Sequence, residues 1–142
     1  MLMTPPLTAK RTLTSKHTII NVNPVPASRP RVPRFGKPFY VGKYRDFRSH
    51  MDAWVEEHSH RHQPLSESAL HCDVTFVVHS PRKPANPYPL GDVDNYLKAI
   101  WDSLQGRAFF KDDKQIESVN AVKRYVVDGE EPHILITFKD TR

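Results

Sequence analysis

Apolar residues recur with helical spacing in two segments of this 142-residue chain. In the first segment, from Tyr44 to Val55, they fall at positions i, i+3, i+7, i+10 and i+11, which is the stripe of an amphipathic helix. The second stripe runs from Leu97 to Leu104, and Gly106 follows it as a stop signal. The spacing therefore predicts two helices, the first ending near residues 58–62.

Four other segments are rich in β-branched residues or alternate apolar with polar positions, which is typical of strands. The predicted strands cover residues 17–22, 70–78, 115–127 and 133–138. Asp128-Gly129 joins the last two, and this dipeptide is a common hairpin signal, so we expect those two strands to pair. The order β-α-β-α-β-β predicts an α+β fold, with a small mixed or antiparallel sheet and two helices packed on one face.

Length and composition predict a single domain. Residues 1–16 contain two prolines and no apolar periodicity, which predicts a flexible N-terminal tail before one domain at residues 17–142. The single cysteine, Cys72, excludes an internal disulfide and fits a reducing compartment. No apolar run approaches the roughly 18 residues needed to span a bilayer. We therefore expect a cytoplasmic protein with no membrane partner.

Positive charge is concentrated in residues 1–50. They hold ten Lys and Arg residues against one Asp, a net charge of +9, so the rest of the chain carries −4 of the total of +5. Basic and aromatic residues alternate there, which suits a surface that neutralises phosphates and stacks on bases. A solvated basic surface is the simpler alternative. The candidate DNA contacts are Arg29, Arg31 and Arg34, together with Arg82 and Lys83 in a proline-rich loop.

Four carboxylates gather in the second half of this basic chain. Asp92 and Asp94 lie two residues apart before the second predicted helix, and Asp112 and Asp113 follow that helix. In extended backbone, residues two apart point the same way, so the first pair could face one ion. Clustered carboxylates are good ligands for Mg²⁺, which can in turn bridge to a phosphate. The cluster therefore indicates a metal-assisted reaction on a polyanion.

Each of these residues also has a purely structural interpretation. Asp92 or Asp94 could cap the helix, and Asp94 could form an ordinary i,i+4 pair with Lys98. Residues 112–113 could be a solvated turn. Asp113 could approach Asp92 only if the strand after it starts beside the end of the 70–78 strand. Carboxylates more than roughly 8 Å apart could not share a Mg²⁺ ion that holds its ligands near 2.1 Å.

The two acidic segments together resemble the signature of the RusA-like Holliday junction resolvases. Residues 92–98 read Asp-Val-Asp-Asn-Tyr-Leu-Lys, an Asp-x-Asp-Asn-x-x-Lys pattern, and residues 109–116 carry Asp-Asp just before a strand. Between them, Trp101-Asp102 is similar to an aromatic-Asp pair of that signature. The similarity extends loosely to residues 26–28, where such proteins have a loop containing Pro and Ser.

The resemblance implies a RusA-like fold and a homodimeric, Mg²⁺-dependent endodeoxyribonuclease, with Mn²⁺ as an alternative ion. Such an enzyme cuts four-way DNA junctions symmetrically in recombination and repair. The resemblance assigns Asp92, Asp94 and Asp113 to metal binding and catalysis, makes Lys98 the essential lysine, and leaves Asp112 outside the set. It also points to a bacterial, phage or prophage source.

In physical terms, Lys98 would offset the charge that develops on the phosphate in the transition state. Asn95 could orient a carboxylate or contact the DNA, although an Asn at a helix start is often only a cap.

Two other functions stay open on the sequence. A non-catalytic protein that binds junctions or single strands would need the carboxylates only for its structure. A nuclease that acts on other branched DNA would use the same residues as a resolvase. Enzymes that transfer phosphoryl groups from nucleotides are disfavoured, because no Gly-rich phosphate loop occurs among the five glycines.

Overall fold

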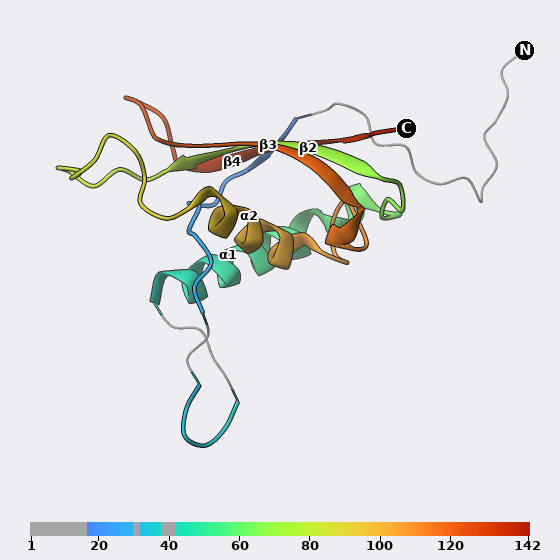
Figure 1. Ribbon diagram of the computed structural model, residues 1–142, viewed down its shortest axis with the longest axis horizontal. Coiled ribbons are helices and arrows are strands. Elements are labelled where there is room, and N and C mark those ends of the chain that lie inside the picture. The colour runs from blue at the N-terminus through green and yellow to red at the C-terminus, as the bar shows by residue number, and fades with distance from the viewer. Residues whose placement is uncertain (1–16, 30–31, 38–41) are drawn as a thin grey trace, which may run out of the picture.

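A computed structural model describes residues 17–29, 32–37 and 42–142 of the chain (Figure 1). The tail predicted at residues 1–16 and the candidate DNA contact Arg31 lie outside the described residues. No helix in the described ranges is long and apolar enough to cross a membrane.

The described elements follow the predicted order, with two short 3-10 turns added. They are β1 (Thr18–Ile20), α1 (Gly42–His58), η1 (Ser59–His62), β2 (Leu70–Val78), α2 (Val93–Leu104), η2 (Asp113–Gln115), β3 (Ile116–Tyr125) and β4 (His133–Asp140). Both helices lie on one face of the sheet, so the molecule has two layers (Figure 1). This is the α+β architecture that the hydrophobic pattern predicts.

The sheet has four strands in the order β1-β4-β2-β3. β2 pairs antiparallel with β4 and parallel with β3, which makes the sheet mixed. The predicted hairpin between the last two strands is wrong, because β2 lies between β3 and β4. The crossover through α2 delivers β3 parallel to β2. The connection at residues 126–132 then crosses the end of β2, over the roughly 10 Å that separate strands two places apart.

The core lies between the sheet and the helices. The apolar stripe that predicts α1 is buried along its whole length, and its members are Tyr44, Phe47, Met51, Trp54 and Val55. α2 contributes Ile100 and Leu104, both fully buried, and β2 contributes Phe76. Cys72 on β2 is also fully buried. Burial of these side chains, at about 25 cal/mol for each Å² of apolar surface, fixes the position of α2 on the sheet.

Candidate active site

α2 carries a row of charged side chains on one exposed face. Asp94, Lys98 and Asp102 follow one another at intervals of four residues, so the helical repeat stacks them along one side. They line a shallow hollow of about 260 Å³ together with Leu97, Trp101 and Asp113. The fold therefore brings the essential lysine of the predicted set and two of its three carboxylates to one surface depression.

Lys98 pairs with Asp102 and not with Asp94. Its Nζ atom lies 3.5 Å from Oδ2 of Asp102, and its side chain is 64% exposed. The ordinary i,i+4 pair with Asp94, which the sequence left open, is not formed. An exposed helical pair of this kind contributes only about 0.3–0.5 kcal/mol. Lys98 can therefore leave Asp102 for an anionic ligand at little cost.

Asp92 occupies the N-cap position of α2 without acting as a side-chain cap. Its backbone is extended, and its carboxylate makes no capping hydrogen bond. Instead, the Asp92 carbonyl accepts hydrogen bonds from the amides of Asn95 (3.0 Å) and Tyr96 (3.3 Å). Asp94 follows in the first turn, where the helix dipole favours a negative charge. Both carboxylates are exposed, and neither makes a hydrogen bond or ion pair with another described residue.

Asp112 and Asp113 have different local roles. The Asp112 carboxylate accepts a hydrogen bond from the Lys114 amide at 2.9 Å and forms a capping box with Gln115. The Gln115 amide group also donates to the carbonyls of Ser66 (3.0 Å) and Ser68 (2.9 Å). Asp112 thus anchors η2 as its cap, a more specific structural role than the solvated turn that the sequence left open. The neighbouring side chain, Asp113, is left to face the hollow.

The two acidic segments lie at opposite ends of α2. β3 begins beside the first residue of β2, with Ile116 opposite Leu70. The condition for Asp113 to return to Asp92 within one chain is therefore not met. The Asp113 amide donates to the side chain of Gln105, the C-cap of α2. At about 1.5 Å of rise per residue, the two caps of α2 are roughly 20 Å apart.

Consistent with this separation, no three His, Cys, Asp or Glu side chains in the described ranges come close enough to hold a metal ion together. One chain alone does not assemble the predicted trio of Asp92, Asp94 and Asp113. The assignment of these residues to a metal stays a prediction, and it requires a geometry that a single copy lacks.

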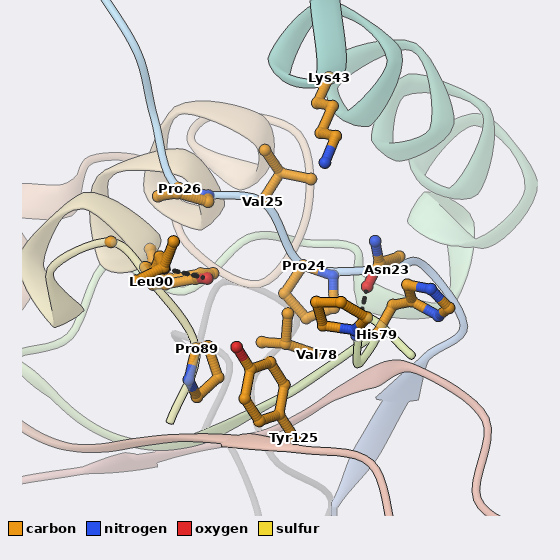
Figure 2. A pocket seen from close by; sticks show the side chains of 13 residues that line it. Asn23, Pro24, Val25, Pro26, Lys43, Val78, His79, Pro89, Leu90 and Tyr125 are labelled. Atoms are coloured by element: carbon orange, nitrogen blue, oxygen red, sulfur yellow. Dashed lines mark hydrogen bonds between the residues drawn. The ribbon is translucent and has the colours of Figure 1, made fainter. Parts of the chain in front are cut away.

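Three segments meet at the N-terminal end of α2. The Ala27 amide donates to the Asn95 carbonyl at 2.9 Å, and the His79 amide donates to the Asn23 side chain at 2.9 Å. Between them lies a hollow of about 530 Å³, toward which Lys43 extends from the first turn of α1 (Figure 2). The contacts place the N-terminal segment, the loop after β2 and the motif side by side.

The basic candidate DNA contacts that the structure describes are all exposed, whereas Asn95 is half-buried. Arg29 follows Ala27 by two residues, and Arg82 and Lys83 lie in the loop between β2 and α2. Arg34 lies further along the N-terminal segment, with its guanidinium 5.8 Å from the centre of the Phe35 ring. Phe35 itself is 84% exposed. These positions are accessible to a polyanion, but none of them contacts the acidic residues.

Two residues at this end were not identified from the sequence. Lys123 of β3 donates to the carbonyls of Pro89 (2.8 Å) and Gly91 (2.5 Å), and the Tyr96 hydroxyl donates to that of Leu90 at 2.9 Å. The alternation of core-facing and outward-facing positions along β3 could have identified Lys123. Positions 119, 121, 123 and 125 share a face, and the other three pack against the core. A lysine at a core-facing position is unusual unless it has partners.

The family model described as Endodeoxyribonuclease RusA matches residues 21–139. The match spans both helices, β2 and β3, the N-terminal segment from residue 21, and both acidic segments. No individual curated protein matches the chain.

Proposed function

The chain belongs to the RusA endodeoxyribonuclease family, and from this membership we propose that it is a metal-dependent endonuclease that resolves four-way DNA junctions. Its place would be in DNA recombination and repair. One observation supports this proposal beyond the family match. Asp94, Lys98 and Asp113 line one exposed hollow at the position of the family-like motif. Carboxylates beside a lysine suit hydrolysis of a phosphodiester.

The carboxylates of Asp92, Asp94 and Asp113 are suited to a hard divalent cation such as Mg²⁺ or Mn²⁺. None of the three forms a hydrogen bond or ion pair through its side chain with any residue in the described ranges. Their oxygens are therefore available as ligands, and oxygen ligands are those that Mg²⁺ prefers. When bound, the metal supplies activation of a water molecule and stabilisation of the leaving 3′ oxygen.

The chain's own residues have separate tasks in this proposal. Lys98, with its 64% exposed side chain, would turn from Asp102 to the phosphate and offset its growing negative charge. Asn95 is half-buried in the first turn of α2, and its carbonyl is bonded to Ala27. Its side chain would orient Asp92 or Asp94, or contact the sugar-phosphate backbone. Asp112 would have no part in the chemistry, because its carboxylate caps η2.

A homodimer would resolve the separation of the two acidic segments. If two copies pack their α2 helices antiparallel about a two-fold axis, the N-terminal end of one helix meets the C-terminal end of the other. Asp92 and Asp94 of one copy would then lie near Asp113 of the second copy. Two equivalent sites would result, as symmetric cleavage of two strands requires.

The α2 surface favours this arrangement. Leu97 and Trp101 are only half-buried in the single chain and lie between the two acidic ends of the hollow. An antiparallel partner would cover these apolar side chains, which contributes to association at about 25 cal/mol for each Å² buried. A cation between Asp94 and Asp113 of different copies would also offset their mutual repulsion.

DNA would approach along the basic end of the molecule. Arg29, Arg34, Arg82 and Lys83 are exposed, and Lys43 borders the hollow beside the motif. These side chains would neutralise phosphates and hold the junction arms without reading their sequence.

The test is cleavage of a synthetic four-way junction in Mg²⁺ or Mn²⁺, compared with flap and linear duplex DNA of the same sequence. We expect paired nicks at symmetric positions in the junction, little cutting of duplex, and no cutting by the Asp92→Asn variant. Equal cutting of flaps would indicate a broader branched-DNA nuclease. Tight junction binding by wild type without cutting, across several sequences and both metals, would show a binding protein instead.

A further inference from the structure

The loop that leads into the motif ends in three carbonyls that are each held by a side chain. Lys123 bonds the carbonyls of Pro89 and Gly91, and the Tyr96 hydroxyl bonds that of Leu90. Gly91 immediately precedes Asp92. Hydrogen bonds from an ammonium group are roughly twice as strong as those between neutral groups. The peptide before Asp92 is therefore held more firmly than the peptides of an exposed loop whose carbonyls bond only water.

The position of Lys123 explains why its ammonium group reaches this loop. β3 is the neighbour of β2, and its last residue, Tyr125, pairs with Val78 at the end of β2. The loop to α2 leaves β2 at that point, so Lys123, two residues earlier on β3, lies beside it. The ammonium group also lies 5.7 Å from the centre of the Tyr88 ring. Lys123 thus contacts Tyr88, Pro89 and Gly91.

The N-terminal segment also packs closely against this loop. Gly91 has a φ of +94°, and a Cβ built there would lie 2.8 Å from Cγ of Pro26. Pro26 is held in place because the next residue, Ala27, bonds the Asn95 carbonyl. Figure 2 shows Pro26, Pro89 and Leu90 around the same hollow. Gly91 is therefore held both by the Lys123 bond to its carbonyl and by the close packing of Pro26.

We propose that Lys123 is a positioning residue for Asp92: its bonds to Pro89 and Gly91 set the direction in which the Asp92 carboxylate leaves the backbone, and with it the affinity for the metal. This inference rests on the proposed function, because it takes Asp92 as a metal ligand. Asp92 makes no capping bond of its own, so the preceding peptide is what orients it. Groups that orient metal ligands typically change metal affinity 10- to 100-fold when removed.

The test compares Lys123→Met, which keeps the length of the side chain but removes its donors, with Lys139→Met. Lys139 is an exposed lysine on β4 and is a matched control. Three quantities are measured on the intact protein: Mn²⁺ affinity by the paramagnetic resonance signal of the free ion, hydrogen exchange in the peptide covering residues 88–94, and junction affinity without divalent metal. None of these requires cleavage.

We expect Lys123→Met to weaken Mn²⁺ binding about tenfold and to accelerate exchange in residues 88–94, with junction affinity unchanged within about twofold, since the phosphate contacts are elsewhere. Lys139→Met should match wild type in all three. Tyr96→Phe, which loses only the bond to Leu90, should weaken Mn²⁺ binding by a smaller factor, about threefold.

Unchanged Mn²⁺ affinity in a folded Lys123→Met protein would overturn the proposal. If that variant does not fold, Lys123→Gln takes its place, because its shorter side chain gives up the ammonium bonds to Pro89 and Gly91, and unchanged Mn²⁺ affinity in Lys123→Gln would overturn the proposal equally. A wild-type protein that binds Mn²⁺ but cuts no DNA would refute the proposed function while leaving the role of Lys123 measurable.

Discussion

Lys98 and Asp102 form an ion pair one helical turn apart on α2, with Nζ 3.5 Å from Oδ2. The four-residue spacing places Lys98 on the same helix face as Asp94, but its ion pair is with Asp102 and not with Asp94. Because both side chains reach solvent, the pair is weak and can be exchanged for a phosphate. In the absence of DNA, the predicted catalytic lysine is therefore paired with a side chain on the same helix face as Asp94.

Replacement of Lys98 by Met should reduce junction cleavage by about 10²- to 10³-fold, because a charge that stabilises the transition state is lost. Junction affinity should change by less than about threefold, since one phosphate contact among many is removed. Single-turnover cleavage and a gel-shift titration in Ca²⁺ measure the two effects. The companion variant Asp102→Asn should cut within about threefold of wild type, because it removes only a surface pair. An equal loss in both variants would contradict the separate role of Lys98.

Replacement of Gly91 by Ala should cost about 1–3 kcal/mol of stability, because a side chain at positive φ is strained. It should also abolish most cleavage, because the new methyl group would displace the peptide before Asp92. Gly129→Ala is the matched control, since Gly129 also has positive φ (+80°) but a Cβ added there would meet no atom within 4 Å. Urea unfolding and junction cleavage separate the two effects. Full activity in a folded Gly91→Ala variant would show that the close packing against Pro26 is dispensable.

Acid should weaken the turn between β3 and β4 through Glu130. Its carboxylate receives two hydrogen bonds from Arg124 (2.6 and 2.8 Å) and one from the Val127 amide (3.0 Å). The Arg124 bonds, then the Val127 bond, lower the pKa of Glu130 from 4.5 to about 2. The ionised carboxylate stabilises the fold fully at pH values above its pKa in the unfolded chain. This stabilisation is lost as the pH falls through the lower pKa of the folded state.

The stability difference between wild type and Glu130→Gln should therefore be largest above pH 5 and should shrink between about pH 4.5 and pH 2. High salt should reduce the difference, because the pair is open to solvent. Urea unfolding at several pH values measures it. A difference that is constant over this pH range would contradict the role of the Arg124 pair.

The helices and strands follow from the sequence because their patterns depend on local periodicity. The stripe from Tyr44 to Val55 is buried as predicted, and residues 70–78 form β2 with the predicted bounds. Strand pairing, in contrast, depends on contacts that periodicity does not encode. Asp128-Gly129 looks like a hairpin turn, but the apolar strand β2 takes the place between β3 and β4.

The candidate site shows the same limit. The resemblance to the family signature assigns Asp92, Asp94, Lys98 and Asp113 to the candidate site, and it can be found in the sequence because the signature is local. Whether these residues meet depends on the register of β3 against β2, and Ile116 opposite Leu70 places Asp113 at the far end of α2. Lys123 lies in no motif, and its proposed role depends on two backbone carbonyls in a loop 34 and 32 residues away in the chain. Contacts of that kind require the fold.

In the proposed enzyme, the catalytic carboxylates come from two copies of the chain and act on a four-way junction. The most direct measurement uses a heterodimer of one Asp94→Asn chain and one Asp113→Asn chain, co-expressed with different tags and purified through both. The two homodimers should be inactive. In the heterodimer, one site would contain both altered residues and the other site neither, so about half of the sites stay intact.

We expect this heterodimer to nick one strand of the junction at a rate near half that of wild type, without completing the paired cut. If wild type resolves the junction but the heterodimer is as inactive as the two homodimers, the shared site is contradicted.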